Sequence, residues 1–243
     1  MNQNTSKTVL ILGANSDVAK QCILQYIEKG FSVIAASRNT SSLKEFVQRN
    51  NLDTKVKVLH FDSTDFDSHQ IFYDELTTKP QVVVYAAGFL IDNKKALSDF
   101  KGTQQMMLVN YMGAVSILNI IATDKSNQNL ERIIGLSSLS GVRGRKSNFV
   151  YGSTKAAFTT YLAGLRQELA PRNIKVNVLI SGYINTKINA GLDLNKNLLM
   201  EADYVAKHIV NAGNSFTIVP NFKWKMIYLV LKILPESLVA KLP

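Results

Sequence analysis

The chain has 243 residues, of which 46% are hydrophobic and 19% charged, and its formal net charge is +10. This composition is typical of a globular protein and excludes a disordered one. Cys22 is the only cysteine, so the chain cannot form an internal disulfide, which is consistent with a reducing compartment. Its three histidines lie far apart and without cysteine partners, so we expect no metal site. The lysines and arginines are scattered rather than gathered into a basic stripe with aromatics, which excludes a simple nucleic-acid footprint.

The N-terminal residues contain no long apolar stretch before the first strand-like run, so we expect no signal peptide. No continuous apolar segment reaches the roughly 18 residues of a membrane span. A cytoplasmic protein follows as the expectation.

Seven nearly continuous apolar runs, rich in β-branched residues, predict strands that are covered on both faces. They lie at residues 8–13, 32–37, 56–61, 82–87, 132–138, 174–181 and 215–220. Helical candidates alternate with them, at 17–29, 65–77, 103–123, 150–170 and 200–212. This alternation predicts an α/β fold with one doubly wound, mainly parallel sheet of the Rossmann type and helices on both faces. We expect one domain at residues 1–220 and an amphipathic helical tail at 221–243.

The first predicted strand leads into "GANSDVAKQ", a turn that opens a helix. Free backbone N–H groups at a helix N-terminus favour a pyrophosphate, and Gly13 suits the tight turn. The later glycines of a full phosphate-binding motif are absent, because Asp17 and Ala19 stand in their places. Alone, this turn is a weak signal for a nucleotide site.

A tyrosine followed four residues later by a lysine occurs three times, as Tyr151/Lys155, Tyr183/Lys187 and Tyr228/Lys232. On a helix this spacing puts both side chains on one face, where an ammonium can act on a phenol. Short motifs of this kind arise by chance, so the surrounding sequence must decide among the three pairs.

The context favours the first pair. Gly13 opens the first turn, "FDSTD" follows the third strand, "YAAG" ends the fourth and "VNYMGA" supplies Asn110. "SSLSG" ends the fifth strand, with Ser138 ahead of Tyr151 and Lys155. This ordered set resembles the short-chain dehydrogenase/reductase family, in its compact single-domain branch, over about residues 7 to 220.

The resemblance implies a catalytic set of four residues. Tyr151 would donate a proton to a carbonyl oxygen that receives negative charge, with its phenol pKa lowered by Lys155 and by an oxidised nicotinamide. Lys155 would also hold the nicotinamide ribose, Ser138 would orient the carbonyl, and Asn110 would position a water that relays protons to Lys155.

The same resemblance implies a cofactor site. The end of the second strand reads "AASRNTS", with Ser37 where an NAD site usually has an acid and Arg38 beside it. An arginine suits a 2′-phosphate, so NADP(H) is expected in preference to NAD(H). The full expected set is Gly13, Asn15, Ser16, Asp17, Val18, Ser37, Arg38, Asp62, Ser63, Ala86, Ala87, Gly88, Gly182, Ile184 and Thr186.

Some positions depart from the family pattern. Asp17 replaces a glycine, and a carboxylate directed at the pyrophosphate would oppose binding, so we expect Asp17 to cap the helix instead. Ser181 stands where a proline is common, and "YAAG" lacks a frequent asparagine. These changes leave the four-residue set intact.

Two segments bear on the substrate. "GVRGRKSNF" places Arg143, Arg145 and Lys146 between Ser138 and Tyr151, where they would attract an anionic substrate or simply form a solvated loop. "NTKINAGLDLNKNLLM" (185–200) is expected to form much of the pocket or its lid.

The tail "NFKWKMIYLVLKILPESLVAKLP" is too short to span a bilayer and mixes apolar residues with lysines. Three interpretations stay open: a helix in the interface of an anionic membrane at the inner face of the cell, an oligomer contact, or a flap over the pocket.

We therefore expect an NADPH-dependent oxidoreductase that reduces a carbonyl or runs the reverse reaction, with a lipidic or lipid-linked keto-sugar as the expected substrate. The alternative from another class is a non-catalytic NADP-binding sensor or scaffold that its tail recruits to a membrane or a partner. The resemblance also implies a homodimer or homotetramer that forms through the helices at 103–123 and 150–170.

Overall fold

The computed structural model describes residues 7–187 and 194–241 and has one parallel sheet at its centre. The spatial order of its strands is β3-β2-β1-β4-β5-β6-β7. The strands are β1 (Thr8–Leu12), β2 (Ser32–Ser37), β3 (Val56–His60), β4 (Val82–Tyr85), β5 (Arg132–Ser138), β6 (Lys175–Ser181) and β7 (Thr217–Ile218). The order reverses between β1 and β4, which makes this the switch point at which such folds bind ligands.

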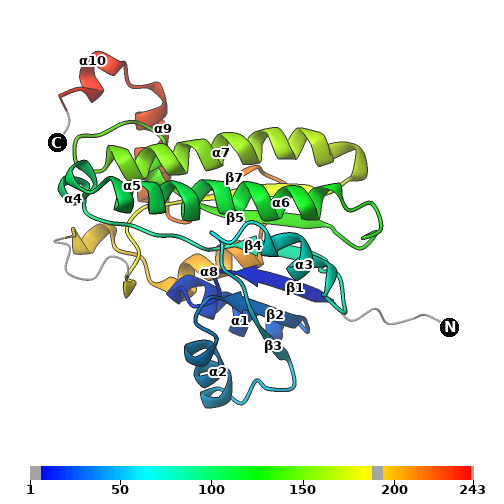
Figure 1. The fold of residues 1–243 in the computed structure, drawn as a ribbon. Coiled ribbons are helices and arrows are strands. Elements are labelled where there is room, and N and C mark those ends of the chain that lie inside the picture. Colours follow the sequence, from blue (N-terminus) through cyan, green and yellow to red (C-terminus); the bar gives the residue numbers. More distant parts are fainter. Residues whose placement is uncertain (1–6, 188–193, 242–243) are drawn as a thin grey trace.

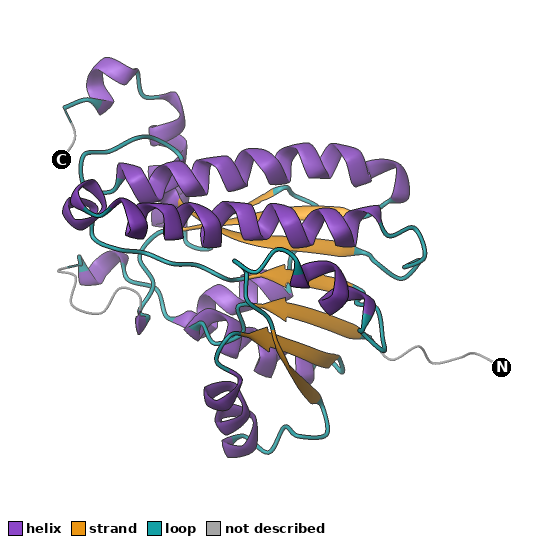
Figure 2. Ribbon diagram, in the orientation of Figure 1, coloured by secondary structure: helices purple, strands orange, loops and turns teal. Residues whose placement is uncertain are grey.

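Helices cover both faces of the sheet (Figures 1 and 2). The larger ones are α1 (Asp17–Glu28), α2 (Thr40–Arg49), α3 (Ser68–Asp74), α6 (Gly113–Thr123), α7 (Phe149–Leu169) and α8 (Ala202–Val210). Helices α1 and α8 pack together on one face, while α6 packs beside α3 and α7 on the other. Shorter elements are α4 (Asn93–Ser98), α5 (Phe100–Met107), η2 (Leu139–Gly141), η3 (Ala170–Arg172) and η5 (Lys196–Leu198).

The strands are buried because both faces are covered. Every residue of β1 is buried, and the central residues of β4, β5 and β6 join it in a single apolar core. The prediction of a doubly wound parallel sheet is confirmed. Helix α2 was missing from the predicted elements, although Asn39 caps it and Leu43 and Val47 form its buried stripe.

Helices α5 and α6 join through a π-helical turn, η1 (Leu108–Met112), into one continuous run. Among the described residues this run, Phe100–Thr123, is long and apolar enough to cross a membrane by length and composition. Here it is a core helix, because Met106, Ile117, Leu118 and Ile121 are fully buried in the fold.

The tail forms helix α9 (Phe222–Ile233) and the short helix α10 (Glu236–Val239), which lie on the side of the molecule where the strands end (Figure 1). Helix α9 is anchored to the domain: Trp224 is only 4% exposed, and both Trp224 and Leu231 belong to the main core. The Trp224 indole donates a hydrogen bond to the Leu198 carbonyl at 2.8 Å and meets Tyr183 edge-on.

We predict that Trp224→Ala lowers the free energy of unfolding by about 3–5 kcal/mol, because it leaves a cavity between α9 and the sheet. Urea unfolding measures this change. Lys225→Ala is the matched control on the exposed side of the same helix and should change stability by less than about 0.5 kcal/mol. Equal stability of the two variants would contradict the anchoring of α9.

Candidate active site

Ser138, Tyr151 and Lys155 meet where the strands end. Ser138 is the last residue of β5, and Tyr151 and Lys155 lie one turn apart at the start of α7. The Ser138 hydroxyl lies close enough to the Tyr151 phenol to lower its pKa, and Lys155 Nζ lies 5.8 Å from the centre of the Tyr151 ring. The three side chains therefore form one polar group at the edge of the sheet.

Two glycines allow this arrangement. A Cβ on Gly152 would lie 2.5 Å from the Ser140 carbonyl oxygen, and one on Gly141 would lie 2.7 Å from the Ala156 amide nitrogen. Without side chains at these positions, the η2 turn touches α7 through its backbone. This contact places the end of β5 against the first turns of α7.

Lys155 is a buried cation. Its side chain is 4% exposed and Nζ donates a hydrogen bond to the Leu136 carbonyl at 2.9 Å. Burial lowers the pKa of this ammonium from 10.5 to about 8. The amine therefore keeps its charge at neutral pH and loses it only slightly above.

Tyr151 differs from the expectation. Burial raises the pKa of its phenol to about 12, and the hydrogen bond with Ser138 offsets only part of that rise. The prediction that Lys155 lowers this pKa does not hold in the chain alone, because the ammonium is bonded to Leu136 rather than to the phenol. Tyr151 is accordingly protonated throughout the neutral range.

Asn110 lies in the π-helical turn and fixes the backbone after β4. Its side-chain oxygen accepts from the Phe89 amide at 2.7 Å, and its amide nitrogen donates to the Phe89 carbonyl at 2.9 Å and to Thr154 at 3.1 Å. A Cβ on Gly88 would lie 3.7 Å from the Asn110 oxygen and 3.9 Å from Lys155 Nζ. Asn110 is thus the link between Gly88 and helix α7.

The other two tyrosine/lysine pairs have different surroundings. Tyr183 and Lys187 lie in the irregular segment after β6, not on a regular α-helix. Tyr228 and Lys232 lie on α9, with Lys232 Nζ 5.7 Å from the ring centre. Only the pair on α7 stands beside the end of β5.

The turn from β1 into α1 forms a tight cradle. Gly13 has a φ of +83°, and a Cβ there would lie 2.3 Å from the Ala87 amide nitrogen. The cradle therefore requires glycine for both its backbone conformation and its close approach to the segment after β4. Asn15 donates hydrogen bonds to Ser37 and to the Asn39 carbonyl, which ties this turn to the end of β2.

The prediction that Asp17 caps α1 is wrong. Ser16 is the N-cap, and its hydroxyl accepts from the Ala19 amide at 3.1 Å. Asp17 begins the helix, and its carboxylate accepts from the Lys187 amide at 2.8 Å. The carboxylate is thereby held on the segment after β6, and it joins the two segments expected to enclose a dinucleotide.

Further expected cofactor residues lie along the same edge. Asp62 follows β3; burial acts to raise its carboxyl pKa, but hydrogen bonds from Thr64 and the charge of Arg38 outweigh this and lower it. Arg38 itself is exposed at the end of β2. Val18 and Ser63 are buried, Ala86 and Ala87 follow β4, and Ile184 and Thr186 lie after β6.

Gly182 opens the segment after β6 and touches the tail. A Cβ on Gly182 would lie 2.0 Å from the Trp224 ring, so the indole occupies the space that a side chain would need. Ser181, the residue before it, pairs in register with Ser138. Helix α9 therefore packs against the residue that follows β6, beside the strand end that carries Ser138, a contact that nothing local in the sequence indicates.

Arg143 also holds the tail. Its guanidinium donates to the Leu231 and Lys232 carbonyls, each at 3.0 Å, at the C-terminus of α9. The solvated loop, one of the two alternatives expected for Arg143, is replaced by this contact with the tail. Arg145 is half-buried and its Nε has no hydrogen-bond partner among the described residues. Residues 188–193, in the expected pocket segment, lie outside the described residues.

The doubly wound fold carries the Gly13 turn and the Ser138, Tyr151 and Lys155 side chains at the carboxyl edge of its sheet. This combination is that of a nucleotide-dependent oxidoreductase. Residues 7–197 match the family model described as short chain dehydrogenase, and the chain belongs to that family. It is accordingly an NAD(P)-dependent short-chain dehydrogenase/reductase, as the resemblance implied.

Curated relatives and solved structures agree with this assignment. An uncharacterized oxidoreductase of Staphylococcus epidermidis is 28% identical over 209 residues, which span 85% of this chain and 90% of the relative. One from Staphylococcus aureus strain USA300 is 27% identical over 217 residues, with 86% and 91% covered. The fold is similar to that of a Burkholderia cenocepacia short chain dehydrogenase in complex with NADP, with a TM-score of 0.82, 18% identity, and 96% and 95% covered. It is also similar to ElxO with NADP bound, with a TM-score of 0.80, 22% identity, and 91% and 100% covered.

We predict that Lys155→Met stabilises the protein by about 1–3 kcal/mol at pH 7, since it removes a buried charge and one hydrogen bond. The pKa of Lys155 is lower in the folded state than in the unfolded state, so its cost is full below pH 8 and vanishes as the pH rises to 10.5. Denaturant unfolding at several pH values measures the difference. Lys175→Met, at an exposed lysine, is the control. A stability gain in Lys155→Met that does not change with pH would contradict the prediction.

Proposed function

We propose that this protein is an NADPH-dependent carbonyl reductase that uses Tyr151 as its proton donor. The observation that carries the proposal is the meeting of Ser138, Tyr151 and Lys155 beside the Gly13 cradle at one edge of the sheet. The competing idea of a non-catalytic NADP-binding sensor gains no support, since a binding protein has no need of this group.

The chemistry that NADP(H) supplies when bound is hydride transfer to or from the substrate carbon. Tyr151 donates its phenolic proton to the carbonyl oxygen as negative charge develops there. The Ser138 hydroxyl donates a hydrogen bond to the same oxygen and orients it. The Lys155 ammonium would stabilise the phenolate that Tyr151 becomes and would hold the nicotinamide ribose hydroxyls.

The protonated phenol can supply the proton that carbonyl reduction consumes. With its pKa raised to about 12, Tyr151 carries the proton that carbonyl reduction consumes, whereas alcohol oxidation needs the phenolate. Asn110 helps to position the catalytic side chains of α7, since its hydrogen bonds to Phe89 and Thr154 join the segment after β4 to that helix.

The residues around the cradle fit a dinucleotide. The glycine turn has no room for a side chain, and the N-terminal end of α1 presents backbone N–H groups to a pyrophosphate. Asn15 has a buried side-chain oxygen without a hydrogen-bond partner among the described residues, which leaves it available to a ligand. The proposed cofactor residues are Gly13, Asn15, Ser16, Val18, Ser37, Arg38, Asp62, Ser63, Ala86, Ala87, Gly88, Gly182, Ile184 and Thr186. Asp17 belongs to this site as the residue that joins its two segments.

NADP(H) is proposed over NAD(H) because Arg38 offers an exposed guanidinium at the end of β2, where Ser37 replaces the usual acid. Several proteins with this fold support the preference: those from Burkholderia cenocepacia and Sphingobium yanoikuyae were solved with NADP and NADPH.

For the substrate we propose a lipidic or lipid-linked carbonyl compound, such as a keto-sugar on a lipid carrier. The support is the position of helix α9. Its Trp224 packs against Gly182, beside the strand end that carries Ser138, and the helix exposes several apolar side chains. We further propose a cytoplasmic homodimer or homotetramer formed through α6 and α7, whose outer surface has a groove lined by Tyr111, Ala157, Tyr161 and Gly164.

Tyr151→Phe should reduce NADPH-dependent carbonyl reduction by at least about a hundredfold, because it removes the proton donor but keeps the ring. NADPH fluorescence titration should show unchanged binding. The matched control is Tyr228→Phe, the same change in another tyrosine/lysine pair, which should keep full activity. A carbonyl panel of soluble and lipid-linked compounds is the assay, and turnover that survives in the Tyr151 variant would refute the proposed role.

Arg38→Ala should weaken NADPH binding by about 10–100-fold and leave NADH binding unchanged, because it removes charged hydrogen bonds to the 2′-phosphate alone. Competition titration with the two cofactors measures both values. Arg49→Ala, at an exposed arginine on α2, is the control. An equal loss of NADPH and NADH affinity would mean that Arg38 does not bind the 2′-phosphate.

A homologous series of aliphatic ketones should show kcat/KM rising by up to about fourfold per methylene, as each group enters an apolar pocket. Steady-state NADPH oxidation across the series measures the slope. Ketones carrying ether oxygens in the chain serve as controls of equal length. A flat dependence on chain length would argue against a lipidic substrate.

A further inference from the structure

Helix α9 presents an apolar stripe to solvent on the face opposite its anchor. Phe222 and Ile233 are 76% and 80% exposed, and Met226, Leu229 and Val230 are each nearly half exposed. Their spacing along the helix places all five within one stripe about 100° wide. A contiguous exposed stripe of this kind marks a surface that contacts something apolar.

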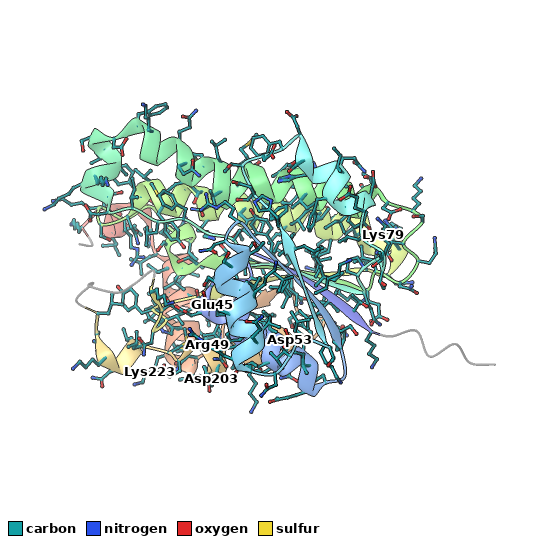
Figure 3. The ribbon with its side chains drawn as sticks, turned by 60° about the horizontal axis from the view of Figure 1, so that its bottom comes forward. Glu45, Arg49, Asp53, Lys79, Asp203 and Lys223 are labelled. Carbon is teal, nitrogen blue, oxygen red and sulfur yellow. The ribbon has the colours of Figure 1, made fainter. Side chains whose placement is uncertain are left out.

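Lysines border the stripe on both sides. By the same helical geometry, Lys223 lies along one edge and Lys225 and Lys232 lie along the other, and all three are exposed. Helix α9 itself contains no acidic residue. Across the described residues the one salt bridge is Glu45–Arg49 on helix α2 (Figure 3), so none of the three lysines forms an ion pair with a described carboxylate.

The domain holds this face outward. Trp224 fills the space above Gly182 at one end of the helix, and Arg143 binds the Leu231 and Lys232 carbonyls at the other end. Lys223 also reaches the Asn197 carbonyl at 3.2 Å and lies at the surface (Figure 3). Since the opposite face is committed to these contacts, the helix cannot rotate to bury its apolar stripe.

We propose that α9 is a docking surface for an anionic lipid bilayer, with the stripe in the acyl boundary and the lysines on the lipid phosphates. An apolar stripe bordered by cations is complementary to such an interface, which is apolar below and negative above. A second copy of this chain is a poorer occupant, because a twofold contact through the same stripe would set six lysines against one another. Docking goes beyond the proposed reaction and does not depend on it.

Docking would also orient the enzyme. Because Gly182 packs on Trp224 and Arg143 binds the end of α9, the end of β6 lies about one helix diameter from the bound face. Helix α10, with Leu238 half exposed, extends from the same side of the molecule (Figure 1). A carbonyl carried on a membrane lipid would then reach the site over a short path.

The test is cosedimentation of the full chain, with NADPH present, on vesicles of equal parts phosphatidylglycerol and phosphatidylcholine. We expect binding to these vesicles and much weaker binding to pure phosphatidylcholine. Lys225→Gln with Lys232→Gln should lower the partition coefficient by about thirtyfold at low salt. Phe222→Ser with Ile233→Ser should lower it at least tenfold.

Matched controls lie on other faces. Lys44→Gln with Lys57→Gln removes the same charge, and Ile71→Ser removes an apolar side chain that is 61% exposed on α3. Neither should change vesicle binding. NADPH titration and circular dichroism confirm that every variant is folded, and none of these residues belongs to the proposed active site.

Absence of wild-type binding to the anionic vesicles would overturn the proposal, as would equal binding by the α9 variants and the controls. Sedimentation velocity detects the second-copy alternative: an oligomer that dissociates in Phe222→Ser with Ile233→Ser, without vesicle binding by the wild type, would overturn it too. Vesicle binding requires no turnover, so an inactive enzyme that binds lipid would refute only the proposed reaction.

Discussion

The backbone contact between η2 and α7 is the constraint on which the site depends. Gly141 and Gly152 let the two segments approach until the end of β5 meets the first turns of α7. A side chain at either position would overlap backbone atoms of the facing segment, so η2 and α7 would have to move apart and Ser138 would move away from Tyr151. Parallel strands bring residues from distant parts of the sequence to one edge, but this contact sets the final geometry.

Burial at that edge shifts the pKa values of two ionisable groups in opposite directions. The Tyr151 phenol is kept neutral, since its pKa is raised to about 12, and the Lys155 ammonium is made easier to deprotonate, since its pKa is lowered to about 8. Both shifts favour the uncharged form, as low-dielectric surroundings require. Only the buried Lys155 ammonium costs stability at neutral pH, because the Tyr151 phenol is neutral in both the folded and the unfolded state.

Much of this could be predicted from the sequence because the signals were local. Buried strands appear as continuous apolar runs, and the order of Gly13, Asn110, Ser138, Tyr151 and Lys155 distinguishes one tyrosine/lysine pair from two others. Helix α2 was missed because only a short apolar stripe marks it, in an otherwise polar segment.

The remaining features depend on long-range contacts, which have no local signature. Asp17 was expected to cap its helix, yet the neighbouring Ser16 does so and frees the carboxylate for Lys187, 170 residues away in sequence. Arg143 was expected either to attract an anionic substrate or to lie in a solvated loop, and it binds the end of α9. The pKa of Tyr151 could not be inferred from the motif, because burial depends on the whole fold.

The contact between Gly182 and Trp224 has a consequence for how this sequence can diverge. The indole ring stands where a Cβ at position 182 would be, so the two residues share one volume. A larger residue at 182 is compatible with the fold only in a background where 224 has already become smaller. The order of change is therefore constrained among descendants of this chain: position 224 can change first, but a larger residue that a relative tolerates at 182 cannot be transplanted here alone.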